Sequence, residues 1–151
     1  MREINSELIT NTVAQLCIDA CHKLPENLVD SFHRAAETEV SPLGKQVLIK
    51  LIENDRIARE NNVSYCHDTG LTIVYAEVGQ EVHITGGHFN DAIHSGVRKG
   101  YAQGFMRKSV VGDPLIRVNT NDNTPAVLHT EIVPGDQIRL TVLPKGGGSE
   151  N

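Results

Sequence analysis

The chain has 151 residues, of which 39% are hydrophobic and 22% charged, and a formal net charge of -5. This composition is typical of a globular protein, and no apolar stretch approaches the roughly 20 residues that a membrane-spanning helix needs. The negative charge argues against non-specific nucleic-acid binding, and the pairs Arg98-Lys99 and Arg107-Lys108 are too short to reverse it. We therefore expect a single domain over 1–151 with a small-molecule or protein partner.

The N-terminal residues Met1 to Asn5 are polar and lack the apolar core of a secretory signal. The three cysteines follow no spacing of a secreted disulfide framework, so free thiols are expected. Both features predict a cytoplasmic location.

Residues 1–62 are predicted to be helical, because apolar residues recur there at spacings of three and four. The first stripe covers 9–24 and stops at Pro25. A second stripe over 28–36 is expected to face inward. A third helix is expected to begin after Ser41, since serine caps free helix amides and Pro42 suits the first helical position.

The periodicity changes after Gly70. The β-branched runs 71–78 and 82–85, each bounded by glycine, predict two short strands. Helical spacing resumes from Asn90 despite Gly96, Gly100 and Gly104. Each of these glycines costs a helix about 1 kcal/mol relative to alanine, so their common face predicts close approach of another backbone.

Two alternating segments, 126–133 and 138–143, predict strands near the C-terminus. The intervening Pro134-Gly135-Asp136 suits the turn of a hairpin. The predicted class is therefore α+β: N-terminal helices (1–62), then a mixed β/α region (63–151) with a C-terminal β-hairpin.

Chemistry-bearing side chains are concentrated in Cys66-His67-Asp68-Thr69-Gly70, between a polar segment and an apolar run. Two ordinary explanations remain open at this point: a lone cysteine is often a small buried apolar residue, and aspartate often caps a turn. Near the C-terminus, Lys145 precedes Gly146, Gly147 and Gly148. Consecutive glycine amides can converge on an anion, although the same composition suits a flexible tail.

Five ordered motifs resemble the iron-sulfur hydro-lyases, the family of class I fumarate hydratase and L(+)-tartrate dehydratase. Two carry most of the likeness: 66–70, similar to the family's Cys-Gln-Asp-Thr-Gly, and 145–151, similar to its Lys-Gly-Gly-Gly-Ser. The other three are 107–111, 122–126 and 133–136. The likeness covers the whole chain and is strongest from Cys66 onward.

The resemblance implies a 4Fe-4S cluster that is held by three cysteines and leaves one iron open to substrate. Cys66 would be one ligand, and the family's other two lie downstream of the glycine segment. We interpret Cys17 and Cys21 as core thiols, because Cys17 lies on the apolar stripe of the first helix. The chain is thus expected to lack two cluster ligands, to be inactive alone, and to need the remainder of the alpha subunit and a beta subunit, whether through truncation or a split gene.

The resemblance also assigns roles to individual residues. Asp68 would be catalytic and would contact substrate near the open iron, and Gly147 would bring its backbone to the substrate. Arg107 would bind a substrate carboxylate through the planar set of donors of its guanidinium. The alternative is a solvated cation near a helix end. His67 departs from the family's usual glutamine, which leaves the substrate open, since imidazole titrates near neutral pH. Lys145 is given no direct role, and no role is assigned to the scattered histidines His88, His94 and His129.

The predicted function is reversible dehydration of a small hydroxy-dicarboxylate, either malate to fumarate or tartrate to oxaloacetate. The alternative is a non-catalytic interaction module that docks onto the remaining subunits. A mononuclear zinc domain has little support, because no second paired ligand motif accompanies Cys66. Surfaces normally covered by the missing portion make a homo-oligomer possible.

Overall fold

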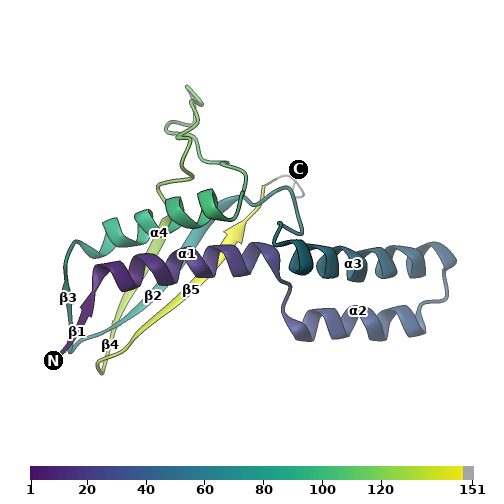
Figure 1. The fold of residues 1–151 in the computed structure, drawn as a ribbon, viewed down its shortest axis with the longest axis horizontal. Coiled ribbons are helices and arrows are strands. Elements are labelled where there is room, and N and C mark those ends of the chain that lie inside the picture. The colour runs from purple at the N-terminus through teal and green to yellow at the C-terminus, as the bar shows by residue number, and fades with distance from the viewer. Residues whose placement is uncertain (148–151) are drawn as a thin grey trace.

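The computed structural model describes residues 1–147, and the fold is α+β as predicted. Figure 1 shows the elements in chain order, and their bounds are β1 Arg2–Asn5, α1 Ser6–His22, α2 Glu26–Thr38, α3 Pro42–Asn61, β2 Leu71–Gly79, β3 Val82–Thr85, α4 Phe89–Gln103, β4 Val127–Val133 and β5 Ile138–Lys145. Within residues 1–147, the four helices and all five strands but β1 lie where the sequence predicts them, within a few residues. The single-domain assignment for 1–151 stays a prediction.

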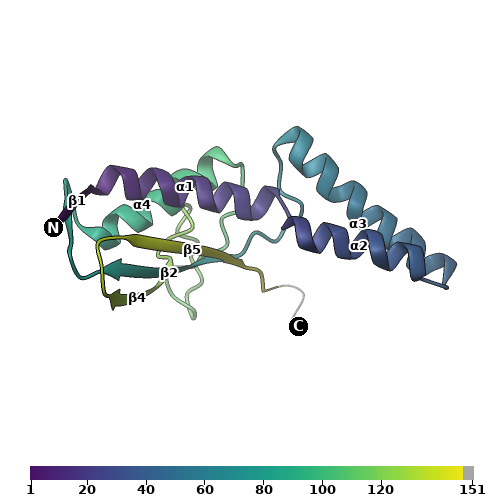
Figure 2. The ribbon, with the colours of Figure 1, turned by 90° about the horizontal axis from the view of Figure 1, so that it is seen from below.

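A three-stranded sheet of order β4-β2-β5 forms one layer, and α1 and α4 lie side by side over one of its faces (Figures 1 and 2). A separate parallel pair, β1 and β3, lies at the start of these two helices. The core between the layers is apolar and comprises Ile4, Ile9, Val13, Cys17, Cys21, Val74, Ala92, Ile93, Val97, Tyr101, Met106 and Ala126. Burial of a side chain such as Ile93, which is 0% exposed, contributes about 1.5–3 kcal/mol to folding.

The predicted C-terminal hairpin is wrong, because β4 and β5 do not pair with each other. Strand β2 lies between them, parallel to β4 and antiparallel to β5. The turn at 134–136 instead crosses the end of β2, where the Gly135 carbonyl accepts a hydrogen bond from the Glu81 amide at 2.9 Å. Since β2 is apolar on both faces over most of its length, it is suited to the central position.

The glycines of α4 meet another backbone, as predicted. A Cβ atom added to Gly96 would lie 2.7 Å from the Thr10 carbonyl oxygen, and one added to Gly100 would lie 2.7 Å from the Ala14 carbonyl oxygen. Both carbonyls belong to α1. The absence of side chains at these two positions therefore permits the close packing of α1 on α4.

Helices α2 and α3 form a helical hairpin, here named the arm, that extends beyond the sheet (Figures 1 and 2). The start of α3 is confirmed: the Ser41 hydroxyl accepts a hydrogen bond from the Gly44 amide, and Pro42 is the first helical residue. The expectation that α2 faces the core is wrong. None of its residues, all of which the structure describes, is buried, because its apolar stripe packs mainly on α3 and not on the sheet core.

Asp55 fixes the base of the arm. This buried carboxylate accepts hydrogen bonds from the Leu24 amide at 2.9 Å and from Arg59 Nε at 2.6 Å. The arm is thereby joined to the chain just after α1. Within residues 1–147, no helix is both long and apolar enough to cross a membrane.

Candidate functional site

The turn 66–70 connects the end of the arm to β2, and its last residue must be glycine. Gly70 has a φ of +61°, and an added Cβ would lie 2.0 Å from the Lys145 carbonyl oxygen. Strand β5 is the cause, because its register places Lys145 opposite Leu71. The pairing of β2 with β5 thus brings the C-terminal glycine segment against the turn.

Hydrogen bonds to α4 and to the segments that follow it fix the position of the turn. The Tyr101 hydroxyl, on the completely buried side chain of an α4 residue, donates to the Thr69 carbonyl at 2.7 Å. The Thr69 hydroxyl in turn donates to the Arg107 carbonyl at 3.1 Å. Asn123 donates through Nδ2 to the Gly70 carbonyl at 3.2 Å. These contacts join the turn to the segment that follows α4.

Asp68 contacts the glycine segment directly. The Gly147 amide donates a hydrogen bond to Asp68 Oδ2 at 3.0 Å. An added Cβ on Gly146 would lie 2.9 Å from the same oxygen, so the backbone passes close to the carboxylate. The predicted motifs 66–70 and 145–151 therefore meet, although Gly148, Ser149, Glu150 and Asn151 lie outside the described residues.

An open depression of about 560 Å³ lies where these segments converge. Four predicted site residues line it: His67, Asp68, Arg107 and Gly147. The cationic side chains on its wall are Arg107, Lys108, Arg117 and Lys145, whereas among residues 1–147 the only carboxylate on the wall is that of Asp68. Despite the net negative charge of the chain, this depression is suited to an anion.

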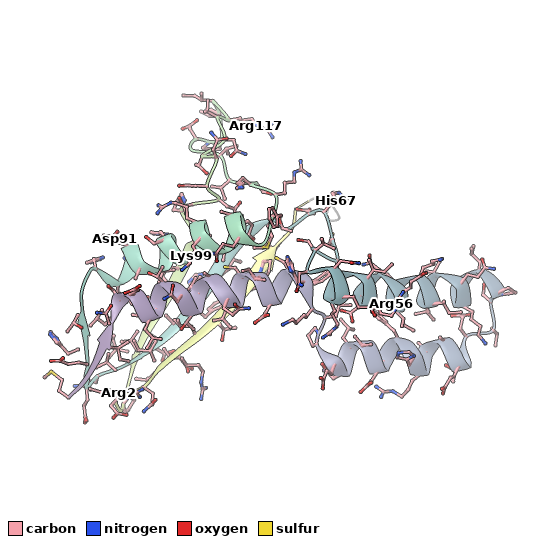
Figure 3. All side chains as sticks on the ribbon, viewed as in Figure 1. Arg2, Arg56, His67, Asp91, Lys99 and Arg117 are labelled. Atoms are coloured by element: carbon pink, nitrogen blue, oxygen red, sulfur yellow. The ribbon has the colours of Figure 1, made fainter. Side chains whose placement is uncertain are left out.

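Figure 3 shows where two of these residues come from. His67 lies beyond the end of the sheet, and Arg117 lies on the loop that projects between α4 and β4. Asp113 orders the loop, because its Oδ1 accepts hydrogen bonds from the Leu115 and Ile116 amides, each at 2.8 Å. These hydrogen bonds lower the pKa of the Asp113 carboxyl.

Cys66 is exposed but does not line this depression. It lines a neighbouring cavity of about 340 Å³, together with Met106 and Thr69. His67 and Arg107 line both cavities, so the two cavities adjoin each other. The structure therefore brings His67, Asp68, Arg107 and Gly147 to one place and sets Cys66 at its edge.

The other two cysteines are buried in α1, as predicted. Burial raises the pKa of the Cys17 thiol to about 12 and that of the Cys21 thiol to about 11. Both thiols are therefore protonated at neutral pH. Only Cys66 is exposed enough to act as a ligand or nucleophile without a change in the core.

Sequence reasoning missed several residues that build the site. Lys108 and Asn123 stand inside motifs that were recognised but given no role, so the motifs were the available signal. Arg117 and Tyr101 carried no local signal. Arg117 belongs to an irregular loop, and Tyr101 has the helical spacing of an ordinary core residue.

Comparison with known proteins identifies the family. Residues 10–151 match the family described as Fumarate hydratase (Fumerase). The chain is 32% identical over 149 residues to the putative L(+)-tartrate dehydratase subunit alpha of Methanocaldococcus jannaschii, covering 95% of this chain and 52% of that protein. It is 33% identical over 117 residues to the anaerobic class I fumarate hydratase of Escherichia coli K12, covering 76% of this chain and 21% of that protein.

A third relative, fumarate hydratase 2 of Leishmania major, is 31% identical over 152 residues, which cover 99% of this chain and 27% of that protein. The chain thus spans about half the length of the first of these relatives and less of the other two. The match extends over almost the whole chain and includes all the segments that meet at the depression. The chain therefore belongs to the fumarate hydratase (Fumerase) family.

Proposed function

We propose that this chain is part of a hydro-lyase that reversibly dehydrates a small hydroxy-dicarboxylate, of the malate/fumarate or tartrate/oxaloacetate type. The observation that carries the proposal is the convergence of His67, Asp68, Arg107 and Gly147 on one cationic depression. The names of the relatives, which are fumarate hydratases and tartrate dehydratase alpha subunits, support the same reaction class. The assembly would be cytoplasmic.

Arg107 would bind one carboxylate of the substrate. Its side chain is exposed and lines the depression, and a guanidinium matches a carboxylate with two parallel hydrogen bonds. Lys108 and Arg117 on the same wall would add attraction for a second carboxylate. A dianion would therefore bind better than a monoanion.

Asp68 would orient the substrate hydroxyl or hold a proton during the reaction. Its carboxylate is half-buried and already accepts the Gly147 amide, so its position is defined before substrate arrives. Gly147 would keep the backbone close to the substrate. His67 would donate a hydrogen bond from its imidazole to a substrate carboxylate.

The residues that the structure describes do not fit a complete iron-sulfur site. Within residues 1–147, no group of three or more His, Cys, Asp or Glu side chains could hold a metal ion, and Cys17 and Cys21 are buried thiols. Cys66 fits a single thiolate attachment, because it is exposed beside a cavity. We assign it one of the three cysteine ligands of a 4Fe-4S cluster, with the other two contributed from outside this chain.

A beta subunit and the remaining part of an alpha subunit would complete the assembly. This proposal is supported by relatives named as L(+)-tartrate dehydratase alpha subunits, from Methanocaldococcus jannaschii and Escherichia coli UTI89, of which the chain covers 52% and 47%. The chain alone would be inactive.

The test is co-expression of the chain with the complementary hydro-lyase segments, purified without oxygen. Malate dehydration is assayed by the ultraviolet absorbance of fumarate, and tartrate dehydration by the formation of oxaloacetate. We expect activity on malate or tartrate. Arg107→Gln should raise KM by about 100-fold, since a charged hydrogen-bonded pair contributes roughly 3 kcal/mol. Arg139→Gln, on the exposed part of β5, is the matched control. An active Arg107→Gln assembly with an unchanged KM would contradict the proposal. So would a wild-type assembly that has no activity on either substrate.

A non-catalytic interaction module is the second candidate, and the arm favours it. Leu43, Val47 and Leu51 recur every four residues on α3 and are 71%, 52% and 41% exposed, which suits contact with another protein. The two candidates differ in their dependence on Cys66. Cys66→Ser should abolish activity of the assembly under the first and leave docking intact under both.

A further inference from the structure

Asn123 is a buried polar residue that lies between the two halves of the candidate site. Its side chain is 0% exposed, and its φ of 62° is in the left-handed region. Asparagine adopts this region more readily than most residues. A buried amide must be hydrogen-bonded to be tolerated, so the partners of Asn123 indicate what it does.

Each end of the amide has a different partner. Asn123 Oδ1 accepts a hydrogen bond from the Ser109 amide at 2.8 Å, and Nδ2 donates to the Gly70 carbonyl at 3.2 Å. A backbone amide can only donate and a carbonyl can only accept, so these partners fix the orientation of the side chain. One side chain therefore joins the turn 66–70 to the segment that follows α4.

Both contacts lie two residues from a proposed substrate-binding group. Gly70 is two residues after Asp68, and Ser109 is two residues after Arg107. The Asn123 segment is itself anchored to α4, because Asp122 Oδ2 accepts a hydrogen bond from Arg98 Nε at 2.8 Å. The Thr69 hydroxyl joins the same two segments at the Arg107 carbonyl. Asn123 adds a second connection between them, and the segment that carries it is held on α4.

We propose that Asn123 is a positioning residue that sets the distance between the Asp68 turn and the Arg107 segment. This inference rests on the proposed function, in which Asp68 and Arg107 act on one substrate. Misplacement of a reacting or binding group by about 1 Å can cost a factor of 100 in rate. Only an amide side chain satisfies both partners, since aspartate has no donor for the Gly70 carbonyl and alanine has neither group.

Two variants separate the bridge from the backbone conformation. Asn123→Gly keeps the left-handed conformation but loses both hydrogen bonds, and Asn123→Asp keeps the acceptor for Ser109 but loses the donor for Gly70. Asn121→Gly is the matched control. Asn121 lies two residues away with a φ of 65°, is exposed, and hydrogen-bonds locally to Asn119.

The first measurement uses the chain alone and does not depend on activity. Amide hydrogen exchange at Ser109 should be fast in Asn123→Gly but slow in the wild type, Asn123→Asp and Asn121→Gly. Backbone NMR shifts of 67–68 and 107–108 should move in Asn123→Gly and stay in place in Asn121→Gly. Unchanged exchange and shifts in Asn123→Gly would overturn the inference.

The second measurement uses the assembled enzyme at a temperature where every variant is folded. Asn123→Gly and Asn123→Asp should lower kcat and raise KM together, with a loss of about 100-fold in kcat/KM, and Asn121→Gly should match the wild type. A merely structural role would lower thermal stability and leave both constants unchanged, which would overturn the inference. An inactive wild-type assembly would instead refute the proposed function, and the exchange and shift data would still decide the bridge.

Discussion

The Gly147 amide donates a hydrogen bond to Asp68 Oδ2 at 3.0 Å, although 79 positions separate the two residues in sequence. The contact follows from the antiparallel pairing of β5 with β2, which sets Lys145 opposite Leu71. The sheet register, rather than either motif, assembles the candidate site. Changes at the junction of the two strands should therefore affect the fold and the site together.

Gly70→Ala tests that junction. A methyl group would be forced within 2.0 Å of the Lys145 carbonyl at a φ of +61°, so we expect a loss of at least about 3 kcal/mol in the free energy of unfolding. Urea denaturation measures this loss. Gly135→Ala is the control, since Gly135 has a φ of +105° but no atom within 4 Å of an added Cβ. Equal losses of unfolding free energy in both variants would show that the positive φ, and not a clash with Lys145, causes the destabilisation.

Gly100→Ala tests the packing of α4 on α1. Alanine favours a helix by about 1 kcal/mol over glycine, but the added Cβ would lie 2.7 Å from the Ala14 carbonyl oxygen. We expect overpacking to prevail, with a net destabilisation of about 1–3 kcal/mol.

The control for that substitution is Gly44→Ala in α3, where the added Cβ meets only the flexible side chain of Glu39. This variant should be neutral or gain up to about 1 kcal/mol. A stabilised Gly100→Ala would mean that α1 and α4 are not in close backbone contact.

The cysteines should differ sharply in reactivity. Cys66 is exposed, whereas burial raises the pKa of Cys17 to about 12 and that of Cys21 to about 11. Alkylation of the native chain at neutral pH, followed by mass spectrometry, should modify Cys66 rapidly and the other two only after unfolding. Comparable native-state rates at all three thiols would contradict the burial of α1.

Asp122 should contribute to acid sensitivity. A hydrogen bond from the Thr124 hydroxyl at 2.7 Å, supported by Arg98, lowers the pKa of its carboxyl to about 2. Because this pKa lies below the unfolded value of about 3.9, the stabilisation is complete above about pH 4 and is lost as the pH falls towards 2. The stability difference between wild type and Asp122→Asn should shrink over that interval. A difference that is constant down to about pH 2 would refute the assignment.

Local features of the fold could be predicted from the sequence. Ser41 and Pro42 mark a helix start through capping chemistry that involves only neighbouring residues, and the glycine face of α4 predicts a close backbone contact. The hairpin prediction failed because strand pairing depends on residues that are distant in the sequence. Pro134-Gly135-Asp136 suits a reversal of the chain, but no local feature shows that β2 lies between the two strands.

The site residues that belong to a recognisable motif could be predicted from the sequence. Those that act through tertiary contacts could not. Cys66, His67, Asp68 and Arg107 stand in recognisable motifs. Tyr101 and Asn123 support the site through hydrogen bonds to residues more than ten positions away, and such partners are set by the packing of α4 and the sheet. Their roles could be read only from the fold.

The most direct test is the iron and acid-labile sulfide content of the assembled hydro-lyase, purified without oxygen, in the wild type, Cys66→Ser and Cys21→Ser. If Cys66 supplies a cluster ligand, Cys66→Ser should lose both the cluster and the activity, and Cys21→Ser should keep both. The chain alone should hold no stable cluster after anaerobic reconstitution. A Cys66→Ser assembly with full iron and sulfide content, or a cluster retained by the chain alone, would contradict this account.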